Sequence, residues 1–384
     1  MKILHLCLGE HYVDNFGYQE NCLTKMHKKL GLNVEIIAST ETIKDNRLFY
    51  VKPSIYENED GIKVTRLPYV NFGSHFVSRK LRAYVGLYGA IEKSSPDIIF
   101  IHGACALGMY SVKNYLKKHP KVNLYVDSHT DYINSGTNWL SMNVLHKILY
   151  KRCHKILEPY AKKYWGTLPA RCDFLNEIYN IPKSKIGFLP QGLIINENFE
   201  KFSIRKRKRE EYKINDEDFV IVIGGKLTKR KNFHVLLEAF ELFTKHDAKL
   251  YVFGGISNDV KEIFEEKRKS DKRIIYAGWV SGEQVPANLV VGDLAVFPGR
   301  HSSIWEQSVA LGLPCVFMKM DNITQIDLGG NCILLNEINK DVILNILNDL
   351  YDNRWKLEQM SLIAEDKGPK EFSYFEIAKK AIEL

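Results

Sequence analysis

The sequence has no long apolar run, no C-x-x-C pair of cysteines and no small-residue cleavage site after its opening apolar stretch. No apolar stretch approaches the roughly 18 residues that a membrane-spanning helix needs, which argues against an integral membrane protein. The opening ILHLCL runs into Glu10 and His11 without a small-residue cleavage site, so we expect a first β-strand and not a signal peptide. The seven cysteines include no C-x-x-C pair, which argues against a zinc site or a disulfide framework and favours reduced thiols in a cytoplasmic protein.

What is present is an ordinary globular composition, long enough for two domains. The 384 residues are 45% apolar and 26% charged. The net charge of +8 is uneven, because residues 1–185 hold 26 lysines and arginines against 16 acidic residues, whereas the remainder holds 28 against 30. The basic half suits an anionic partner such as a membrane surface, a lipid-linked phosphate or nucleic acid. A lysine-rich solvated surface explains the excess equally well.

Two segments of the C-terminal half share one plan of strand, glycine turn and helix. In the first, residues 219–240, a valine- and isoleucine-rich run reaches Gly224 and Gly225, crosses a basic loop and enters an amphipathic helix. Glycine lets backbone amides approach a ligand closely, and a helix N-terminus is electropositive, so this pattern suits a phosphate. Lys226 and Lys231 lie where their ammonium groups could reach it.

The second segment, residues 294–317, repeats this plan. A short strand meets the turn Pro298-Gly299, and we expect a helix to begin near Ser302 or Ser303. The two serines could cap that helix or donate to an anion. Two such strand-turn-helix units at one cleft suit a diphosphate.

At these two segments the sequence resembles glycosyltransferase family 4, the retaining, nucleotide-sugar-dependent enzymes of the two-Rossmann-domain GT-B fold. The stretch GGKLTKRKN is similar to the family's G-R-L-x-x-x-K-G pattern, with Lys226 in place of the usual arginine and Lys231 at the usual lysine. The stretch IWEQSVALGLPCV is similar to the family's E-A-M-A-x-G-x-P-V-V block. The resemblance reaches most of the chain, although its strongest motifs lie in the C-terminal half.

The second segment departs from the family at its pair of acidic residues. Counting back from Gly312 and Pro314 places the family's second glutamate on Gln307, with Glu306 one residue earlier. Either Glu306 or Gln307 is then a candidate for holding the ribose hydroxyls of a nucleotide. For the first acid of the pair, we expect His301 as the replacement.

The resemblance implies an α/β GT-B fold, with two Rossmann-like domains facing a central cleft and a C-terminal helix that crosses back to the first domain. We expect residues 1–192 to form the acceptor-binding domain, 193–366 the nucleotide-sugar-binding domain, and 367–384 the returning helix. KIGFLPQGL is similar to the I-x-V-I-P-N-G-V block where the family's chain crosses between domains. The charged run that follows, residues 193–215, is expected to hold a solvated helix and not a nucleic-acid patch.

The N-terminal half carries weaker motifs. FGYQEN stands where the family has a G-G-x-E turn, so Gly17 is expected to approach the donor diphosphate or the acceptor; a helix-entry turn without a ligand is the alternative. His129 matches a family histidine near the donor sugar and acceptor, where it would bind a hydroxyl or move a proton. A structural role is the alternative for His129, and the favoured one for His102. Residues 76–92 interleave basic and aromatic side chains, which fits a membrane-facing surface or, more commonly, a packed helix with a basic face.

The resemblance implies sugar transfer without a metal or a cofactor, with charge on the departing diphosphate stabilised by cations and helix amides. The only D-x-D match, Asp216-Glu217-Asp218, precedes a strand, so we expect a turn there and no divalent metal. The expected catalytic residues are His129, Lys226, Lys231 and Glu306. The expected substrate-binding residues are Gly17, Gly225, Gly278, Val280, His301, Ser302, Ser303 and Gln307.

These observations predict an enzyme that moves a sugar from a nucleotide sugar, with a UDP sugar as the expected donor, to a glycan, lipid-linked or protein acceptor. The expected setting is cell-surface polysaccharide or glycoconjugate synthesis in the cytoplasm, with peripheral contact to an anionic membrane at its inner face as one extension. The alternatives are a non-catalytic sugar-nucleotide-binding partner of another transferase and another GT-B enzyme such as a sugar-nucleotide epimerase. A nucleic-acid partner is disfavoured because the sequence has no aromatic-basic readout module.

Overall fold

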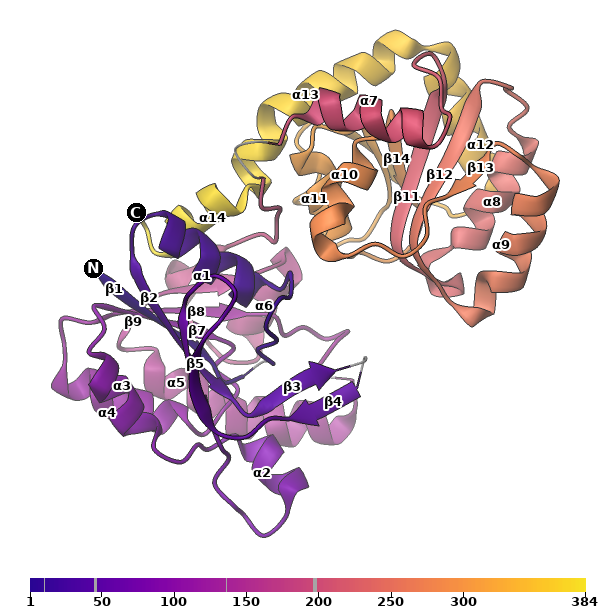
Figure 1. Cartoon of the computed structure of the whole chain (residues 1–384). Helices are drawn as coiled ribbons and strands as arrows, with labels where there is room; N and C mark the ends of the chain where they lie inside the picture. Colours follow the sequence, from indigo (N-terminus) through magenta and orange to yellow (C-terminus); the bar gives the residue numbers. More distant parts are fainter. Residues whose placement is uncertain (10, 45–46, 136, 196–198) are drawn as a thin grey trace. The chain divides into compact units, whose positions relative to one another are not determined.

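The computed structural model covers residues 1–9, 11–44, 47–135, 137–195 and 199–384. Glu10, which follows the expected first strand, lies outside these described residues. The chain forms two compact units (Figure 1). Unit 1 comprises Met1–Pro190 and Ile377–Leu384, and unit 2 comprises Gln191–Glu376. No helix among the described residues is both long enough and apolar enough to span a bilayer.

Unit 1 is built on an eight-stranded sheet with the order β10-β9-β8-β7-β1-β2-β6-β5. Neighbouring strands are parallel except for β5 with β6, and two further strands form a separate antiparallel pair. The central strands are apolar and almost entirely buried, as expected of strands covered on both faces. The strands are β1 (Lys2–Cys7), β2 (Asn33–Ser39), β3 (Glu41–Lys44), β4 (Arg47–Tyr50), β5 (Ser54–Glu57), β6 (Lys63–Leu67), β7 (Ile98–His102), β8 (Asn123–Ser128), β9 (Ala161–Gly166) and β10 (Ile186–Phe188).

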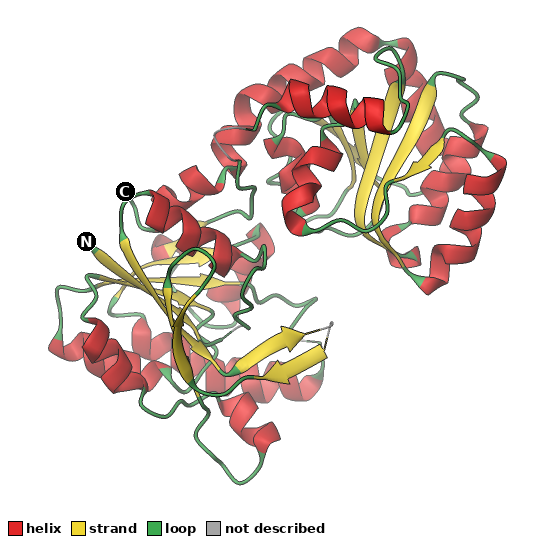
Figure 2. Cartoon of the chain, viewed as in Figure 1, coloured by secondary structure: helices red, strands yellow, loops and turns green. Residues whose placement is uncertain are grey.

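Helices flank this sheet and supply much of its core (Figure 2). Apolar side chains such as Leu87, Val112 and Leu157 pack against the strands in one continuous cluster. The helical elements of unit 1 are α1 (Gln19–Lys29), α2 (His75–Leu81), α3 (Leu87–Ser94), α4 (Met109–Lys118), the π-helix η1 (Ser141–Tyr150), α5 (Lys151–Leu157), α6 (Pro169–Glu177) and the 3-10 turn η2 (Lys183–Lys185).

Residues 76–92 are two short helices, so the expectation of one helix over this stretch was wrong. Between α2 and α3 the backbone takes left-handed conformations at Arg82 (φ 49°) and Gly86 (φ 76°). The amide of Gly108, at the start of α4, donates to the carbonyl of Arg82 at 3.0 Å and so fixes the break from the neighbouring element. Basic and aromatic residues at helical spacing fit two short helices as well as one, because this spacing does not report the break.

Unit 2 is built on a six-stranded, wholly parallel sheet with the order β13-β12-β11-β14-β15-β16. Helices lie on both faces of it (Figure 2). Its strands are β11 (Phe219–Leu227), β12 (Ala248–Ile256), β13 (Ile274–Tyr276), β14 (Leu294–Phe297), β15 (Cys315–Met318) and β16 (Cys332–Leu335). Its helical elements are α7 (Lys201–Glu211), η3 (Lys229–Lys231), α8 (Phe233–Leu242), α9 (Asn258–Ser270), η4 (Gly282–Gln284), α10 (Val285–Leu289), α11 (Ile304–Ala310), α12 (Lys340–Asp352) and α13 (Arg354–Phe372).

Both units therefore have parallel strands joined by helical crossovers, which confirms the predicted α/β class with two Rossmann-like domains. In such sheets ligands bind outside the carboxyl ends of the strands. A ligand-binding site in unit 2 is consequently expected at the carboxyl edge of its sheet.

The glycines of β11 lie within the strand, so the expected glycine turn was wrong. β11 continues past both of them and stays paired with β12 to its last residue. A Cβ at Gly224 would overlap the ring of Phe253, and a Cβ at Gly254 would overlap the carbonyl of Gly225. These glycines therefore allow close packing inside the sheet, and the chain reverses only in η3, just before α8.

The C-terminal segment 367–384 contains the end of one helix and the whole of another. α13 ends at Phe372, and α14 (Tyr374–Ala381) follows the extended Ser373. From Ile377 onward the chain belongs to unit 1, where the indole of Trp165 donates to the carbonyl of Ala381 at 3.0 Å.

The charged run 193–215 contains α7, and its residues 196–198 lie outside the described part of the chain. The expected solvated helix is only partly right. Arg209 is buried, and its Nη2 lies 2.9 Å from Asp293 Oδ2, while Arg205 Nη2 lies 2.5 Å from Asp293 Oδ1. Two of the basic residues thus hold the helix on unit 2 and are not available to an external anion.

Candidate functional site

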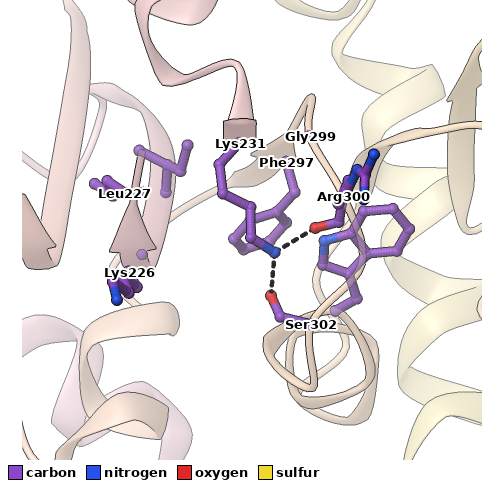
Figure 3. A pocket seen from close by; sticks show the side chains of 10 residues that line it. Lys226, Leu227, Lys231, Phe297, Gly299, Arg300 and Ser302 are labelled. Atoms are coloured by element: carbon purple, nitrogen blue, oxygen red, sulfur yellow. Dashed lines mark hydrogen bonds between the residues drawn. The ribbon is translucent and has the colours of Figure 1, made fainter. Parts of the chain in front are cut away.

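A pocket lies at the carboxyl edge of the unit 2 sheet (Figure 3), and its empty space of about 280 Å³ includes open solvent. It brings together the two sequence segments that share the strand-turn-helix plan, because β11 and β14 are neighbours in the sheet. Its walls are formed by Ile223, Gly224, Lys226, Leu227, Lys231, Phe297, Gly299, Arg300, Ser302 and Trp305.

The two loops that follow β11 and β14 touch through their backbones. A Cβ at Gly299 would overlap the backbone of Lys231, so only glycine fits at this crossing without a shift. The side-chain amide of Asn232 donates to the carbonyl of Pro298 at 2.9 Å. These contacts lock the start of α8 to the loop that leads into α11.

Lys231 joins the same two loops through its side chain. Its ammonium donates to the carbonyl of Arg300 and to Ser302 Oγ at 3.1 Å (Figure 3). It also donates to the carbonyl of His301 at 3.1 Å. Burial, and then the positive charge of Arg230, lower the pKa of Lys231 to about 8. All three acceptors are uncharged, so none of them neutralises the ammonium, and an anion entering the pocket would meet a partly desolvated cation.

Lys226 lines the same pocket from the end of β11 and is exposed. Its backbone pairs with Gly255 of β12, which fixes where its side chain leaves the sheet. The pocket therefore presents two ammonium groups of different character: Lys231 is held in place by hydrogen bonds, and Lys226 faces solvent.

Glu306 of α11 is fully buried. One of its carboxylate oxygens has hydrogen-bond partners, and the other has none. Its Oε1 lies 2.7 Å from His301 Nε2 and accepts from the amide of Gln325 at 2.9 Å. Burial acts to raise the pKa of this carboxyl, but the imidazole of His301 and the hydrogen bonds from His301 and Gln325 outweigh burial and lower it. Oε2 is buried without a hydrogen-bond partner, an arrangement that costs free energy unless a ligand donates to it.

The remaining predicted residues of this segment surround that carboxylate. α11 begins at Ile304, and Ser303 at its N-cap makes no capping bond with its side chain, whereas Ser302 accepts from Lys231. Gln307 is half-buried on the same helix. Trp305 is buried and stacks on Phe317 with ring centroids 4.5 Å apart, so its main role is packing, although it also lines the pocket.

Three glycines with left-handed backbones form a row along the same edge of the sheet. Gly225, Gly254 and Gly278 have φ values of 99°, 103° and 81°. Gly225 pairs with Gly254, whose amide donates to the carbonyl of Gly278 at 2.7 Å. The row runs from the pocket to Gly278, one of the residues predicted to bind the substrate. Trp279, which lies between Gly278 and the predicted Val280, is 75% exposed.

The predicted residues of unit 1 lie at the carboxyl edge of its own sheet. Gly17 is exposed two residues before α1. His129 follows β8, and its Nε2 lies 3.7 Å from Oδ2 of the buried Asp127. His102 is fully buried and bonds Asp127 through Nδ1 at 2.7 Å, which agrees with the structural role favoured for it.

Sequence reasoning missed Arg300, Gln325 and Trp279. Gln325 lies in a loop 19 residues beyond Glu306 and belongs to no motif, so only the fold brings it to the carboxylate. Trp279 could have been found, because an exposed aromatic beside a glycine at a strand end is a common ligand contact. The tripeptide Asp216-Glu217-Asp218 lies in the turn before β11, as expected. Among the described residues, no group of three or more His, Cys, Asp or Glu side chains could hold a metal ion.

Comparison with protein families places the strongest similarity in unit 2. Residues 204–362 match the family described as glycosyl transferases group 1. One relative, an uncharacterized 41.2 kDa protein in the cps region of Klebsiella pneumoniae, is 24% identical over 270 residues, which cover 69% of this chain and 68% of the relative.

Comparison with solved structures shows that the whole chain has the GT-B fold. A glycosyltransferase from Rickettsia africae covers 100% of this chain and 97% of its own with a TM-score of 0.70 and 16% identity. Anabaena Alr3699/HepE in complex with UDP covers 100% and 99% with a TM-score of 0.67 and 13% identity. The UDP-GlcNAc 2-epimerase of Neisseria meningitidis bound to UDP-GlcNAc also aligns, covering 100% and 99% with a TM-score of 0.62 and 13% identity.

Proposed function

We propose that this chain is a retaining glycosyltransferase of family 4 that moves a sugar from a nucleotide diphosphate sugar to a glycan, lipid-linked or protein acceptor. The observation that carries the proposal is the Lys231 ammonium, held between the loops after β11 and β14 by three uncharged acceptors. The match of residues 204–362 to glycosyl transferases group 1 supports the same activity.

The chemistry requires negative charge on the departing diphosphate to be stabilised as the sugar leaves. In the proposed complex Lys231 releases carbonyl contacts and donates to the diphosphate, and Lys226 approaches it from the end of β11. A hydrogen bond to a charged group contributes about 1.5 to 3 kcal/mol, so the two lysines together account for a rate factor of about a hundred or more. Ser302, freed by the movement of Lys231, can donate to the same anion.

Glu306 is the proposed ribose ligand. Its buried Oε2 has no hydrogen-bond partner, and a ribose hydroxyl would supply one. His301, in the place of the family's first acid, keeps the other carboxylate oxygen engaged at 2.7 Å and so fixes the orientation of the group. This geometry favours Glu306 over the half-buried Gln307 as the ribose contact. The base is proposed to lie along Gly278 and Val280.

The donor is proposed to be a UDP sugar, and the reaction is proposed to need no metal ion. UDP is the nucleotide in the complexes of Anabaena Alr3699/HepE, which shares the fold. Lysine ammonium groups can neutralise a diphosphate without a divalent ion. Turnover that persists in excess EDTA would support this, whereas turnover that requires added magnesium or manganese would count against it.

The acceptor is proposed to bind unit 1, where Gly17 and His129 lie at the carboxyl edge of the sheet. His129 would hydrogen-bond a sugar hydroxyl or move a proton. The Klebsiella pneumoniae relative is described as a protein of a cps region, which supports a role in cell-surface polysaccharide synthesis. A cytoplasmic location follows from that role.

Unit 1 is also proposed to make peripheral contact with an anionic membrane at the inner face. Large apolar side chains are exposed on α2 at Phe76 and around η1 at Trp139, Leu140 and Ile148. Basic residues such as Lys147 accompany them, a combination suited to anionic lipid headgroups. Sedimentation of the protein with phosphatidylserine vesicles, and not with phosphatidylcholine vesicles, would support the contact.

The experiment that tests the proposed function is a panel of UDP, GDP and ADP sugars offered to the purified protein. Thermal shift reports binding, because a ligand at 100 times its dissociation constant adds about 2.7 kcal/mol of stability. Slow donor hydrolysis reports catalysis without a known acceptor. Hydrolysis of one donor with retained anomeric configuration is the expected result. Binding without any turnover would favour the non-catalytic partner, and C2 epimerisation of a UDP sugar would favour the epimerase.

A further inference from the structure

Three buried histidines of unit 1 form a hydrogen-bonded chain that the proposed transfer reaction does not use. His27 Nε2 lies 2.9 Å from the carbonyl oxygen of Ala378, and His27 Nδ1 lies 3.0 Å from His5 Nε2. His5 Nδ1 lies 2.9 Å from His102 Nε2, and His102 Nδ1 lies 2.7 Å from Asp127 Oδ2. All four side chains are 0% exposed.

The fold builds this chain of hydrogen bonds from five separate elements. His5 lies on β1 and His102 on β7, which are paired parallel strands, and the backbone of His102 pairs with that of Asp127 on β8. His27 lies on α1, and Ala378 lies on α14 at the end of the sequence. The chain thus runs from the C-terminal helix through the core of unit 1 to the strand end next to His129.

The hydrogen-bonded chain of histidines needs one more proton than three neutral imidazoles supply. Each nitrogen-to-nitrogen contact of 2.9 to 3.0 Å needs a proton between the two atoms, because two lone pairs would repel at that distance. The carbonyl of Ala378 and the carboxylate of Asp127 are both acceptors, so four contacts need four protons. Three neutral histidines provide three, and the fourth must belong to an imidazolium or to a protonated Asp127.

We propose that His102 is the imidazolium of this chain, paired with an ionised Asp127, and that the pair is the positioning element for His129. The proposal rests on the role assigned to His129 in sugar transfer. It assigns His5, His27 and His102 as positioning residues that do not touch the substrate.

The protonation states of the other members agree with this assignment. Burial, followed by the neighbouring histidines, lowers the pKa of His5, and burial lowers that of His27 to about 4, so both rings stay neutral near pH 7. Burial acts to raise the pKa of Asp127, but the charges and hydrogen bonds of His102 and His129 outweigh it and hold the pKa low. The titratable groups that shift the pKa values of His5, His27 and Asp127 are members of the chain itself and His129.

The pair determines what His129 faces. The His129 side chain is partly exposed, and its buried Nε2 lies 3.7 Å from Asp127 Oδ2. With His102 charged, the carboxylate is already balanced and exerts little net pull on a second proton, so His129 keeps a basic nitrogen for a substrate hydroxyl near neutral pH. Without that balance, the buried carboxylate would draw the proton onto His129 instead.

The test is nitrogen NMR of the full chain labelled with ¹⁵N-histidine at pH 8, with His102 identified by the signal lost in His102→Gln. The expected spectrum contains one ring with both nitrogens protonated, at His102. In Asp127→Asn the side-chain amide can donate to His102, so the four contacts need no extra proton and that ring becomes neutral. The matched control is Asp131→Asn, since Asp131 lies just beyond the same strand and pairs with Arg171 Nε at 3.2 Å instead; it should keep the imidazolium.

Kinetics then separate the positioning role from the proposed function. Asp127→Asn is expected to lower kcat about tenfold or more while donor affinity stays within twofold, because no residue of the unit 2 pocket changes. In His102→Gln the ring of His129 should become the imidazolium. A neutral His102 in the wild-type protein at pH 8 would overturn the proposal, even if Asp127→Asn fails to fold. An imidazolium with no donor turnover would refute the transfer function and leave the proton assignment intact.

Discussion

Lys231 is held by two backbone carbonyls and a serine hydroxyl, and no charge among these three acceptors balances its ammonium. In the absence of a ligand, Lys231 organises the loop after β14. With a diphosphate in the pocket, the same ammonium has a stronger, charged acceptor available. A single side chain therefore couples the shape of the loop to donor binding.

The lowered pKa of Lys231 predicts how donor affinity depends on pH. Burial holds this pKa at about 8, so the free protein has a charged ammonium below pH 8 and a neutral amine above it. UDP binds the charged form, and its affinity should fall about tenfold for each pH unit above 8 in titrations between pH 6.5 and 9.5. Below pH 7 the ammonium adds no further pH dependence.

The control for this pH dependence is Lys231→Arg, because arginine stays charged throughout that range. If the variant still binds UDP, its affinity should not fall above pH 8. An identical alkaline decline in wild type and Lys231→Arg would assign the effect to another group.

At the residue scale, only residues that belong to motifs could be proposed as site members from the sequence. Lys231 and Ser302 were expected in one phosphate-binding site, and the structure brings them within 3.1 Å. The choice between Glu306 and Gln307 could not be made by counting, because the helix phase depends on where α11 begins. Gln325 could not be predicted at all, since its contact with Glu306 exists only after the chain has folded.

At the scale of elements, the contact between the loops after β11 and β14 depends on Gly299. Any Cβ there would overlap the Lys231 backbone, which cannot move as a side chain can. We predict that Gly299→Ala separates the two loops, weakens UDP binding at least tenfold and destabilises unit 2 by about 1 to 3 kcal/mol. Urea unfolding and UDP titration measure the two effects.

Gly255→Ala is the matched control, because Gly255 lies in β12 of the same sheet edge with open space around its Cα and no left-handed backbone. Alanine there should be neutral or slightly stabilising, since it reduces the entropy of the unfolded chain. Equal effects of the two substitutions would remove the close contact as the cause.

The two segments whose local structure was predicted wrongly have one physical reason for the error in common. Gly224 and Gly225 indicated a turn, but Gly224 is needed because a Cβ there would overlap the Phe253 ring, and Gly225 because its backbone has a φ of 99°. Residues 76–92 indicated one helix, but packing around Gly108 breaks it. In each case tertiary packing between segments distant in sequence decides the local structure, and a window of neighbouring residues does not contain that information.

At the scale of the whole molecule, the buried histidines are concentrated in unit 1. Burial lowers the pKa of His27 and of His146 to about 4 and that of His154 to about 3, and that of His5 well below its usual value. In the unfolded chain these histidines bind protons near pH 6.5, whereas in the folded unit they stay neutral until the pH falls further. The stability that depends on these four rings staying neutral is therefore complete above pH 6.5 and is lost as pH falls from 6.5 toward 4.

We predict that unit 1 becomes less stable over this range, by up to about 3 kcal/mol for each such histidine. Hydrogen exchange followed by mass spectrometry at pH 7 and pH 5, corrected for the intrinsic exchange rate, resolves the two units by peptide. Protection should drop in peptides of unit 1, and His154→Gln should reduce the drop. Undiminished protection of unit 1 at pH 5 would show that these rings are protonated as easily in the folded unit as in the unfolded chain.

The α/β class was predictable because apolar strands alternate with helical segments in both halves, and the two-domain GT-B arrangement was implied by the resemblance to glycosyltransferase family 4. The sequence also shows the excess of basic residues in the first 185 positions, but it does not show what this excess binds. The histidine chain could not be predicted, because its members lie at positions 5, 27, 102 and 127 and meet only in the folded unit.

The most direct measurement of the central claim is calorimetric titration of UDP into the wild-type protein, Lys231→Ala and Lys229→Ala at pH 7. Lys229 is the neighbouring exposed lysine of the same basic loop, so its removal changes the charge equally without touching the pocket. The account predicts that Lys231→Ala binds UDP about 10 to 100 times more weakly, while Lys229→Ala matches the wild type. Equal affinity of Lys231→Ala and the wild-type protein would contradict it.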